Sequence, residues 1–173
     1  RRQRQMCIRD RTKEKLWPHL PELVDRMLQF YGGILPDFIT AHYADGGYAA
    51  ALAFKKTGIP FSFTGHSLGA QKLDKLGTTT DNWLSMEKRF KFSKRLAAER
   101  ISMKYAAKIM VSTQQEMDEQ YAHPIYMSAL EQLDKTKFEI IPPGVNENIF
   151  SQTAAPKDKA CLLYTSPSPR DFE

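Results

Sequence analysis

Residues 61–69 read FSFTGHSLG, and this stretch indicates the architecture of the chain. An apolar run over 60–64 predicts a strand, and the loop Gly65-His66-Ser67-Leu68-Gly69 follows it directly. The pattern G-x-S-x-G after a strand is typical of enzymes that hold a nucleophilic serine at a sharp turn. The stretch therefore raises two hypotheses. In one, Ser67 is a nucleophile; in the other, the loop has a different function and His66 is its functional residue.

Apolar runs elsewhere predict three more strands, at 37–43, 107–111 and 138–141. Helical spacing predicts helices at 13–31, 48–57, 83–106 and 112–121. This alternation indicates an α/β fold, a Rossmann-like parallel sheet with right-handed crossovers and helices on both faces. Ligands of such sheets bind beyond the carboxyl ends of the strands, where HYADGG (42–47), TGHSLGAQK (64–72) and VSTQQE (111–116) lie.

Local signals refine the helix ends. Asp45-Gly46-Gly47 predicts a turn, in which Asp45 caps the helix that follows. Ser112 or Thr113 is placed to cap the helix at 112–121, with Glu116 completing a capping box. The segment 70–82 is charged, and no helix is predicted there.

The two ends of the chain differ from the rest and resemble translated adapter sequence from transposon-based DNA library preparation. Residues 6–10 back-translate to ATGTGTATAAGAGAC, and its reverse complement, preceded by CT and shifted in frame, encodes residues 161–165. We therefore expect 1–11 and 161–173 to be adapter artefacts. The rest is predicted to be a fragment of a longer gene product, with a domain at 12–150 and the start of a flexible linker at 151–160.

Leaving out the predicted adapter residues lowers the formal net charge from +5 to +2 and removes both cysteines, Cys7 and Cys161. So small a charge does not indicate a nucleic-acid partner. Without cysteine there is no disulfide framework and no thiolate metal site, which favours a cytoplasmic protein. No apolar run is long enough to span a membrane, so no membrane partner is expected.

A serine hydrolase requires an acid and a histidine after the nucleophile. His123 is the only histidine after Ser67, and Asp74, Asp81 and Asp118 are the candidate acids. The elbow should lead into a helix, but the charged segment broken by Gly77 argues against one. This hypothesis stays open as a minor alternative.

A sugar-phosphate site requires cations that converge, because one exposed charge attracts an anion weakly in water. Lys72 follows the glycine-bounded loop, and Lys88, Lys91 and Arg95 share one face of the predicted helix at 83–106. The alternative is a solvated helix face on which Arg95 pairs with Glu99 one turn later. His42 and His66 each end a strand of the same sheet, and either a structural or a catalytic role is open to them.

Three longer stretches carry a resemblance to a known family. They are PDFITAHYADGGYAAALAFKKTGIPFSFTGHSLGAQKLDKL (36–76), RFKFSKRLAAERISMKYAAKIMVSTQQEMDEQY (89–121) and IIPPGVN (140–146). In this order they resemble the N-terminal domain of sucrose-phosphate synthases over nearly all of 12–160. The resemblance implies the partial N-terminal half of a GT-B fold. It also implies a retaining glycosyltransferase that moves glucose from UDP-glucose to fructose 6-phosphate and makes sucrose 6-phosphate.

The same resemblance implies residue roles. His66 contacts the donor glucose near the reacting carbon, and Lys72 and Arg95 bind the acceptor phosphate, with Lys94 a further candidate. Gly65, Gln71 and His42 join the substrate-binding residues. Ser67 is then structural. The partners are small molecules, no cofactor is tightly bound, and UDP-glucose is held mainly by a C-terminal domain that this chain lacks.

Several alternatives remain open from the sequence. A related transferase with another donor or acceptor is one, of the sucrose synthase or mannosylfructose-phosphate synthase type. The others are a serine hydrolase and a non-catalytic sugar-phosphate-binding module. The fragment alone is expected to be inactive, and its oligomeric state cannot be deduced from the sequence.

Overall fold

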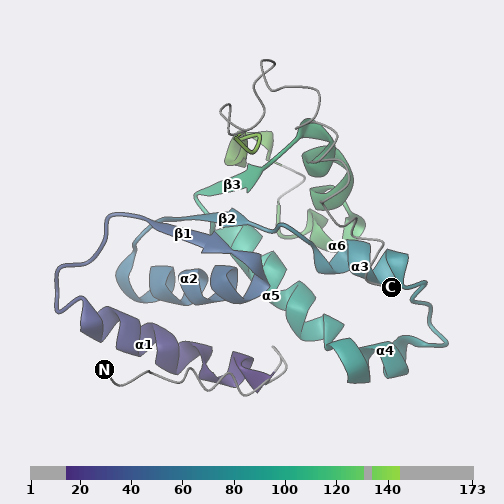
Figure 1. The fold of residues 1–173 in the computed structure, drawn as a ribbon, viewed down its shortest axis with the longest axis horizontal. Coiled ribbons are helices and arrows are strands. Elements are labelled where there is room, and N and C mark those ends of the chain that lie inside the picture. Colours follow the sequence, from purple (N-terminus) through teal and green to yellow (C-terminus); the bar gives the residue numbers. More distant parts are fainter. Residues whose placement is uncertain (1–14, 131–133, 145–173) are drawn as a thin grey trace, which may run out of the picture. The chain divides into compact units, whose positions relative to one another are not determined.

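The structure is a computed structural model that describes residues 15–130 and 134–144. The chain divides into two compact units between Pro142 and Pro143, and the elements described here lie in the first unit. Its centre is a parallel sheet of four strands in the order β1-β2-β3-β4 (Figure 1). The strands are β1 (Ile39–His42), β2 (Phe61–Thr64), β3 (Lys108–Val111) and β4 (Phe138–Ile140). The four predicted strands are confirmed, each somewhat shorter than expected.

The core lies on one face of this sheet. Phe61 and Phe63 are fully buried on β2, and Phe63 pairs in register with Ala41 on one side and Ile109 on the other. Alternate residues of a strand point to opposite faces, so these side chains form a continuous apolar surface. Helix α2 (Tyr43–Thr57) covers it at β1 and β2, as Figure 1 shows.

The opposite face of the sheet is polar at its two edge strands. Thr40 on β1 and Glu139 on β4 are exposed, and Lys108 pairs with Glu139 at 2.7 Å. Consecutive strand order explains this, because right-handed crossovers in one direction all return over the same face. The predicted second layer of helices is therefore not found among residues 15–130 and 134–144, while the α/β class and the parallel sheet are confirmed.

Helix α2 corrects the predicted turn at 45–47. It begins at Tyr43, so Asp45 and both glycines lie in its first turns and Asp45 caps nothing. A Cβ at Gly47 would come within 2.3 Å of the Ser102 hydroxyl and 2.7 Å of the Phe63 ring. Gly47 is thus required for close packing inside a helix, which a sequence pattern does not distinguish from a turn.

The predicted helix at 83–106 is in fact two helices, α4 (Trp83–Phe90) and α5 (Phe92–Tyr105). The break is Lys91, whose φ of 53° ends α4 in the left-handed region. The prediction that Lys88, Lys91 and Arg95 share one helix face is therefore wrong, since Lys88 and Arg95 belong to different helices.

The remaining elements follow the predictions in part. Helix α3 (Gly69–Lys75) forms in the charged segment where none was expected. The helix predicted at 112–121 is largely a π-helix, η3 (Glu116–Tyr121), and Thr113 accepts a hydrogen bond from the Glu116 amide at 3.0 Å as the capping prediction requires. The other elements are η2 (Trp17–His19), α1 (Leu20–Phe30), α6 (Pro124–Met127) and η4 (Lys135–Lys137).

The predicted adapter segments at 1–11 and 161–173 and the predicted linker at 151–160 lie outside the described residues. Those boundaries stay predictions. Within the described part of the chain, no helix combines the length and the apolar composition that crossing a bilayer requires.

Candidate functional site

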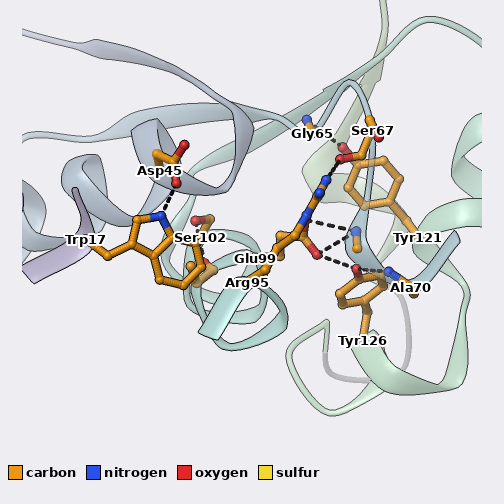
Figure 2. Close-up of polar contacts among 12 residues, drawn as sticks. Trp17, Asp45, Gly65, Ser67, Ala70, Arg95, Glu99, Ser102, Tyr121 and Tyr126 are labelled. Atoms are coloured by element: carbon orange, nitrogen blue, oxygen red, sulfur yellow. Dashed lines mark hydrogen bonds and ion pairs between the residues drawn. The ribbon is translucent and has the colours of Figure 1, made fainter. Parts of the chain in front are cut away.

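The loop between β2 and α3 is held at both ends by buried side chains from distant parts of the chain. The Tyr121 hydroxyl accepts a hydrogen bond from the Gly65 amide at 3.0 Å. At the other end the Gly69 amide donates to the Glu99 carboxylate at 3.0 Å, and the Ala70 amide donates to the Tyr126 hydroxyl at 3.0 Å. Figure 2 shows these contacts converging on the loop from α5, η3 and α6.

The two glycines of the G-x-S-x-G pattern are explained by these contacts. A Cβ at Gly65 would lie 2.5 Å from the Leu68 side chain and 2.8 Å from the Tyr121 hydroxyl. A Cβ at Gly69 would lie 3.0 Å from the Glu99 carboxylate. The pattern therefore results from close packing against buried polar groups and requires no nucleophile.

The geometry of the loop also argues against a catalytic serine. The residue in the left-handed region is His66, with φ 55°, whereas a nucleophile elbow concentrates its strain at the serine. His123 is engaged elsewhere: its Nε2 lies 3.5 Å from Asp74, and its Nδ1 accepts from the Ile125 amide. Among the described residues Ser67 therefore has no histidine base.

His42 and His66 come together at the carboxyl ends of adjacent strands, as their positions predicted. Nδ1 of His42 lies 2.9 Å from Nε2 of His66, so one proton joins the two rings. The rings stack with centroids 5.1 Å apart, and the Tyr43 ring lies 4.7 Å from His66 on another side. The three side chains are exposed and form the accessible part of the site.

A cavity of 160 Å³ lies beside this loop, and both Lys72 and Arg95 line it. The other lining residues are Trp17, Tyr43, Ala44, Asp45, Phe90 and Phe92. The Lys72 ammonium lies 5.1 Å from the centre of the Phe90 ring, a cation–π distance. Two cations and several aromatic rings thus border one hollow, which suits a phosphorylated or otherwise anionic small molecule.

Arg95 is held rigidly at the edge of this cavity. Its Nε donates to Glu99 at 3.0 Å, and its Nη2 donates to the Ser67 carbonyl at 2.6 Å. The predicted pairing of Arg95 with Glu99 is therefore confirmed. It is not a solvated surface pair, because Glu99 is 1% exposed and Arg95 is 24% exposed. Within the described chain no residue accepts from Nη1, which leaves that amino group available to a ligand.

Glu99 is the centre of the buried network. Burial raises the pKa of its carboxyl above the ordinary value, while hydrogen bonds from Tyr126 and Arg95 act in the opposite direction. Burial also raises the pKa of Tyr121 and of Tyr126, so both hydroxyls stay protonated. The Tyr126 hydroxyl can therefore accept from Ala70 and donate to Glu99 at the same time.

The other predicted site residues are placed apart from this cavity. Lys94 lines a separate hollow of 290 Å³ with Trp17 and Tyr48. Gln71 is half-buried on α3, and Gly65 lies under the loop against Tyr121. The structure thus brings Lys72 and Arg95 together and does not bring Lys94 to them.

Sequence reasoning missed several residues of the site. Trp17 donates its indole N–H to Asp45, and both line the cavity although 28 residues separate them. No local pattern joins such distant residues. Glu99 was predicted only as the partner of Arg95 on a solvated helix face, and its burial and its contacts with Gly69 and Tyr126 were missed. Tyr121 and Tyr126 carry no signal that distinguishes them from ordinary core aromatics.

Comparison with known proteins agrees with this arrangement. Residues 12–166 match the family model described as the first GT-B domain of sucrose synthase. The chain belongs to this GT-B family. A probable sucrose-phosphate synthase of Thermosipho melanesiensis is 50% identical over 140 residues, which cover 80% of the chain and 32% of that relative. A sucrose-phosphate synthase of Spinacia oleracea is 37% identical over 127 residues, 64% of the chain and 12% of the relative.

The fold has a solved counterpart. A sucrose-phosphate synthase from Thermosynechococcus elongatus aligns with a TM-score of 0.58 at 19% identity, covering 80% of the chain and 31% of that structure. The predicted GT-B membership and the resemblance to sucrose-phosphate synthases are confirmed. The chain spans about a third of the length, or less, of the relatives it matches.

Proposed function

We propose that this chain is the acceptor-binding first domain of a retaining glycosyltransferase that makes sucrose 6-phosphate from UDP-glucose and fructose 6-phosphate. The observation that carries the proposal is the convergence of Lys72 and Arg95 on one cavity beside His66, at the carboxyl edge of the sheet. The names of the relatives support the choice of substrates.

In this proposal the two cations bind the phosphate of the acceptor. An arginine presents a planar pair of donors and a lysine a mobile point charge, so together they hold a phosphate in one position. That remote binding energy orients the reacting hydroxyl toward the donor sugar. We assign to His66 the contact with the donor glucose near the reacting carbon, and its ring contact with the cavity residue Tyr43 supports this role.

The remaining chemistry is assigned to the substrates and to a second domain. Departing phosphate oxygens of the nucleotide take the proton from the attacking hydroxyl, so no carboxylate base is required here, and charge stabilisation is the main contribution of the protein. UDP-glucose is a co-substrate that is held mainly by a second domain outside this chain. No cofactor is tightly bound. We also propose that the protein is cytoplasmic. The coverage of the relatives supports a longer enzyme.

The test is Lys72→Ala in the full-length enzyme. Losing a charge-assisted hydrogen bond of about 2 kcal/mol is expected to raise KM for fructose 6-phosphate about 30-fold. KM for UDP-glucose should change less than about twofold. Lys75→Ala is the matched control, because Lys75 is an exposed lysine on the same helix, does not line the cavity and should leave both constants unchanged. Equal effects of Lys72→Ala on both substrates would remove the phosphate assignment.

A second candidate is a transferase of the sucrose synthase type, because the matching family model carries that description. Its acceptor is fructose without a phosphate, so it makes no use of paired cations. Comparing the two acceptors on the same enzyme separates the candidates. A preference for fructose 6-phosphate that Lys72→Ala abolishes supports sucrose 6-phosphate synthesis, and a preference for fructose supports the second candidate.

A further inference from the structure

Glu99 contacts three donors that belong to three different elements. Both of its oxygens accept from the Gly69 amide on α3, Oε1 accepts from Arg95 Nε on α5, and Oε2 accepts from the Tyr126 hydroxyl on α6. With 1% of its side chain exposed, it reaches no solvent that could replace these partners.

Such a buried carboxylate adds little to the free energy of unfolding. The free-energy cost of desolvating the carboxylate offsets most of the free energy gained from its hydrogen bonds. Apolar residues of similar volume often stabilise a protein equally well. The benefit of the network is geometric, because each donor has one direction and the carboxylate fixes all three at once.

The elements that Glu99 joins are those that carry the two cations of the cavity. Gly69 begins α3, and Lys72 follows one turn later on that helix. Arg95 uses Nε for Glu99 and Nη2 for the Ser67 carbonyl, which aligns the plane of its guanidinium along the loop. The positions of both cations therefore depend on one buried carboxylate, and Figure 2 shows its contact with Arg95.

We propose that Glu99 is a positioning residue for the acceptor phosphate: its carboxylate holds Arg95 and the first turn of α3 so that the Arg95 and Lys72 side chains converge on one anion. The inference rests on the proposed function, since it assigns a phosphate to these cations. Glu99 itself touches no substrate, and it acts through Arg95 and α3.

Two buried tyrosines that contact the loop provide a matched pair of variants for testing the role of Glu99. Tyr121 and Tyr126 are both fully buried, and each hydroxyl accepts from one loop amide at 3.0 Å. Only Tyr126 also donates to Glu99. The variants Tyr126→Phe and Tyr121→Phe therefore each remove the hydrogen bond to one loop amide, and Tyr126→Phe also removes the hydrogen bond to the carboxylate.

The experiment is steady-state kinetics of the full-length enzyme with Glu99→Gln, Glu99→Asp and the two tyrosine variants. Glu99→Gln keeps the shape but puts an amide N–H against donors, and KM for fructose 6-phosphate is expected to rise about tenfold with KM for UDP-glucose within about twofold. Glu99→Asp restores part of the loss because it keeps the carboxylate. Tyr126→Phe raises the acceptor KM about threefold, and Tyr121→Phe, which does not contact Glu99, raises it clearly less.

A double variant tests whether Glu99 acts through Arg95. In an Arg95→Lys background, adding Glu99→Gln is expected to raise the acceptor KM clearly less than the about tenfold it does alone, since only the first turn of α3 with Lys72 is then left to be positioned. Full additivity would overturn the inference. If Glu99→Gln does not fold, the tyrosine pair still tests it, and equal effects of the two on the acceptor KM would overturn it.

The outcomes separate the inference from the function on which it rests. If Arg95→Lys and Lys72→Ala leave the acceptor KM unchanged, the proposed function fails and the inference fails with it. If those two variants raise it and Glu99→Gln lowers kcat alone, the function stands and only the positioning role is overturned.

Discussion

The exposed part of the β2–α3 loop at His66 and its buried end at Gly69 are built in opposite ways. At the first end His66 is exposed, sits in the left-handed region with φ 55°, and contacts the exposed rings of His42 and Tyr43. At the second end the Gly69 amide enters a buried network centred on Glu99. The comparison teaches that a loop can keep an accessible residue in a strained conformation because buried contacts fix the backbone on both sides of it, at Gly65 and at Gly69.

The same contrast separates what the two ends offer a substrate. The histidine end presents exposed ring nitrogens that can donate a hydrogen bond to a ligand or accept one from it. The other end presents permanent positive charge whose direction is set by buried partners. A transferase needs both, because the acceptor must be fixed while groups near the reacting carbon adjust as charge develops.

The largest expected contrast is in stability. Glu99→Ala leaves buried donors without an acceptor and should lower the free energy of unfolding by about 3 kcal/mol. His66→Ala removes an exposed ring and should change it by less than about 0.5 kcal/mol. Thermal unfolding of the purified variants measures both. Equal shifts in the melting temperature would show that the two ends are not built differently.

A pH titration sharpens the comparison at the buried end, where Glu99 faces Arg95, Tyr126 and the Gly69 amide. Burial raises the pKa of Glu99 above its ordinary value of 4.5. A raised pKa in the folded state contributes stability that is complete below pH 4.5 and is lost as the pH rises through the folded pKa. Wild-type stability should therefore fall with rising pH relative to Glu99→Gln, whose amide does not titrate. Parallel curves in a pH series of denaturant unfolding would contradict this.

The smallest expected effect is at the strained end. The left-handed conformation costs a side chain about 1 kcal/mol, so His66→Gly should stabilise the fold by up to that amount while it lowers the rate. Lys91, with φ 53° and no part in the cavity, is the matched control. Lys91→Gly should give a similar gain in melting temperature with unchanged turnover. A rate loss shared by both variants would mean that strain itself, and not the His66 ring, is required.

Prediction from the sequence succeeded where the signal is local. Runs such as FSFT and KIMV are apolar over one strand length and form β2 and β3. The spacing of Thr113 and Glu116 specified a helix start: Thr113 accepts from the Glu116 amide, and Glu116 accepts from the Ser112 amide instead of the Thr113 amide of a capping box. The pairing of Arg95 with Glu99 followed from helical periodicity.

Prediction failed where distant residues determine the outcome. Gly47 looks like part of a turn but accommodates Ser102 within a helix, and the side chain that it avoids lies 55 positions away in the chain. The sequence predicts one continuous helix at 83–106, but Lys91 interrupts it with a positive φ. Lysine at this position gives no signal for such a conformation. Helix α3 was not predicted because its sequence is charged. Its first two amides donate hydrogen bonds to Glu99 and Tyr126, which lie far away in the chain.

The sequence by itself determined the α/β class, the order of strands and helices, the loops at the carboxyl edge and the family to which the chain belongs. Those features depend on periodicity and composition within short windows. Only the tertiary structure decided which cations share a cavity, why the two glycines of GHSLG are needed, and that Glu99 joins three elements. The contacts of the loop with Glu99 and Tyr126 join groups 30 and 56 positions apart in the chain, and the packing of the folded chain alone brings such groups within hydrogen-bonding distance.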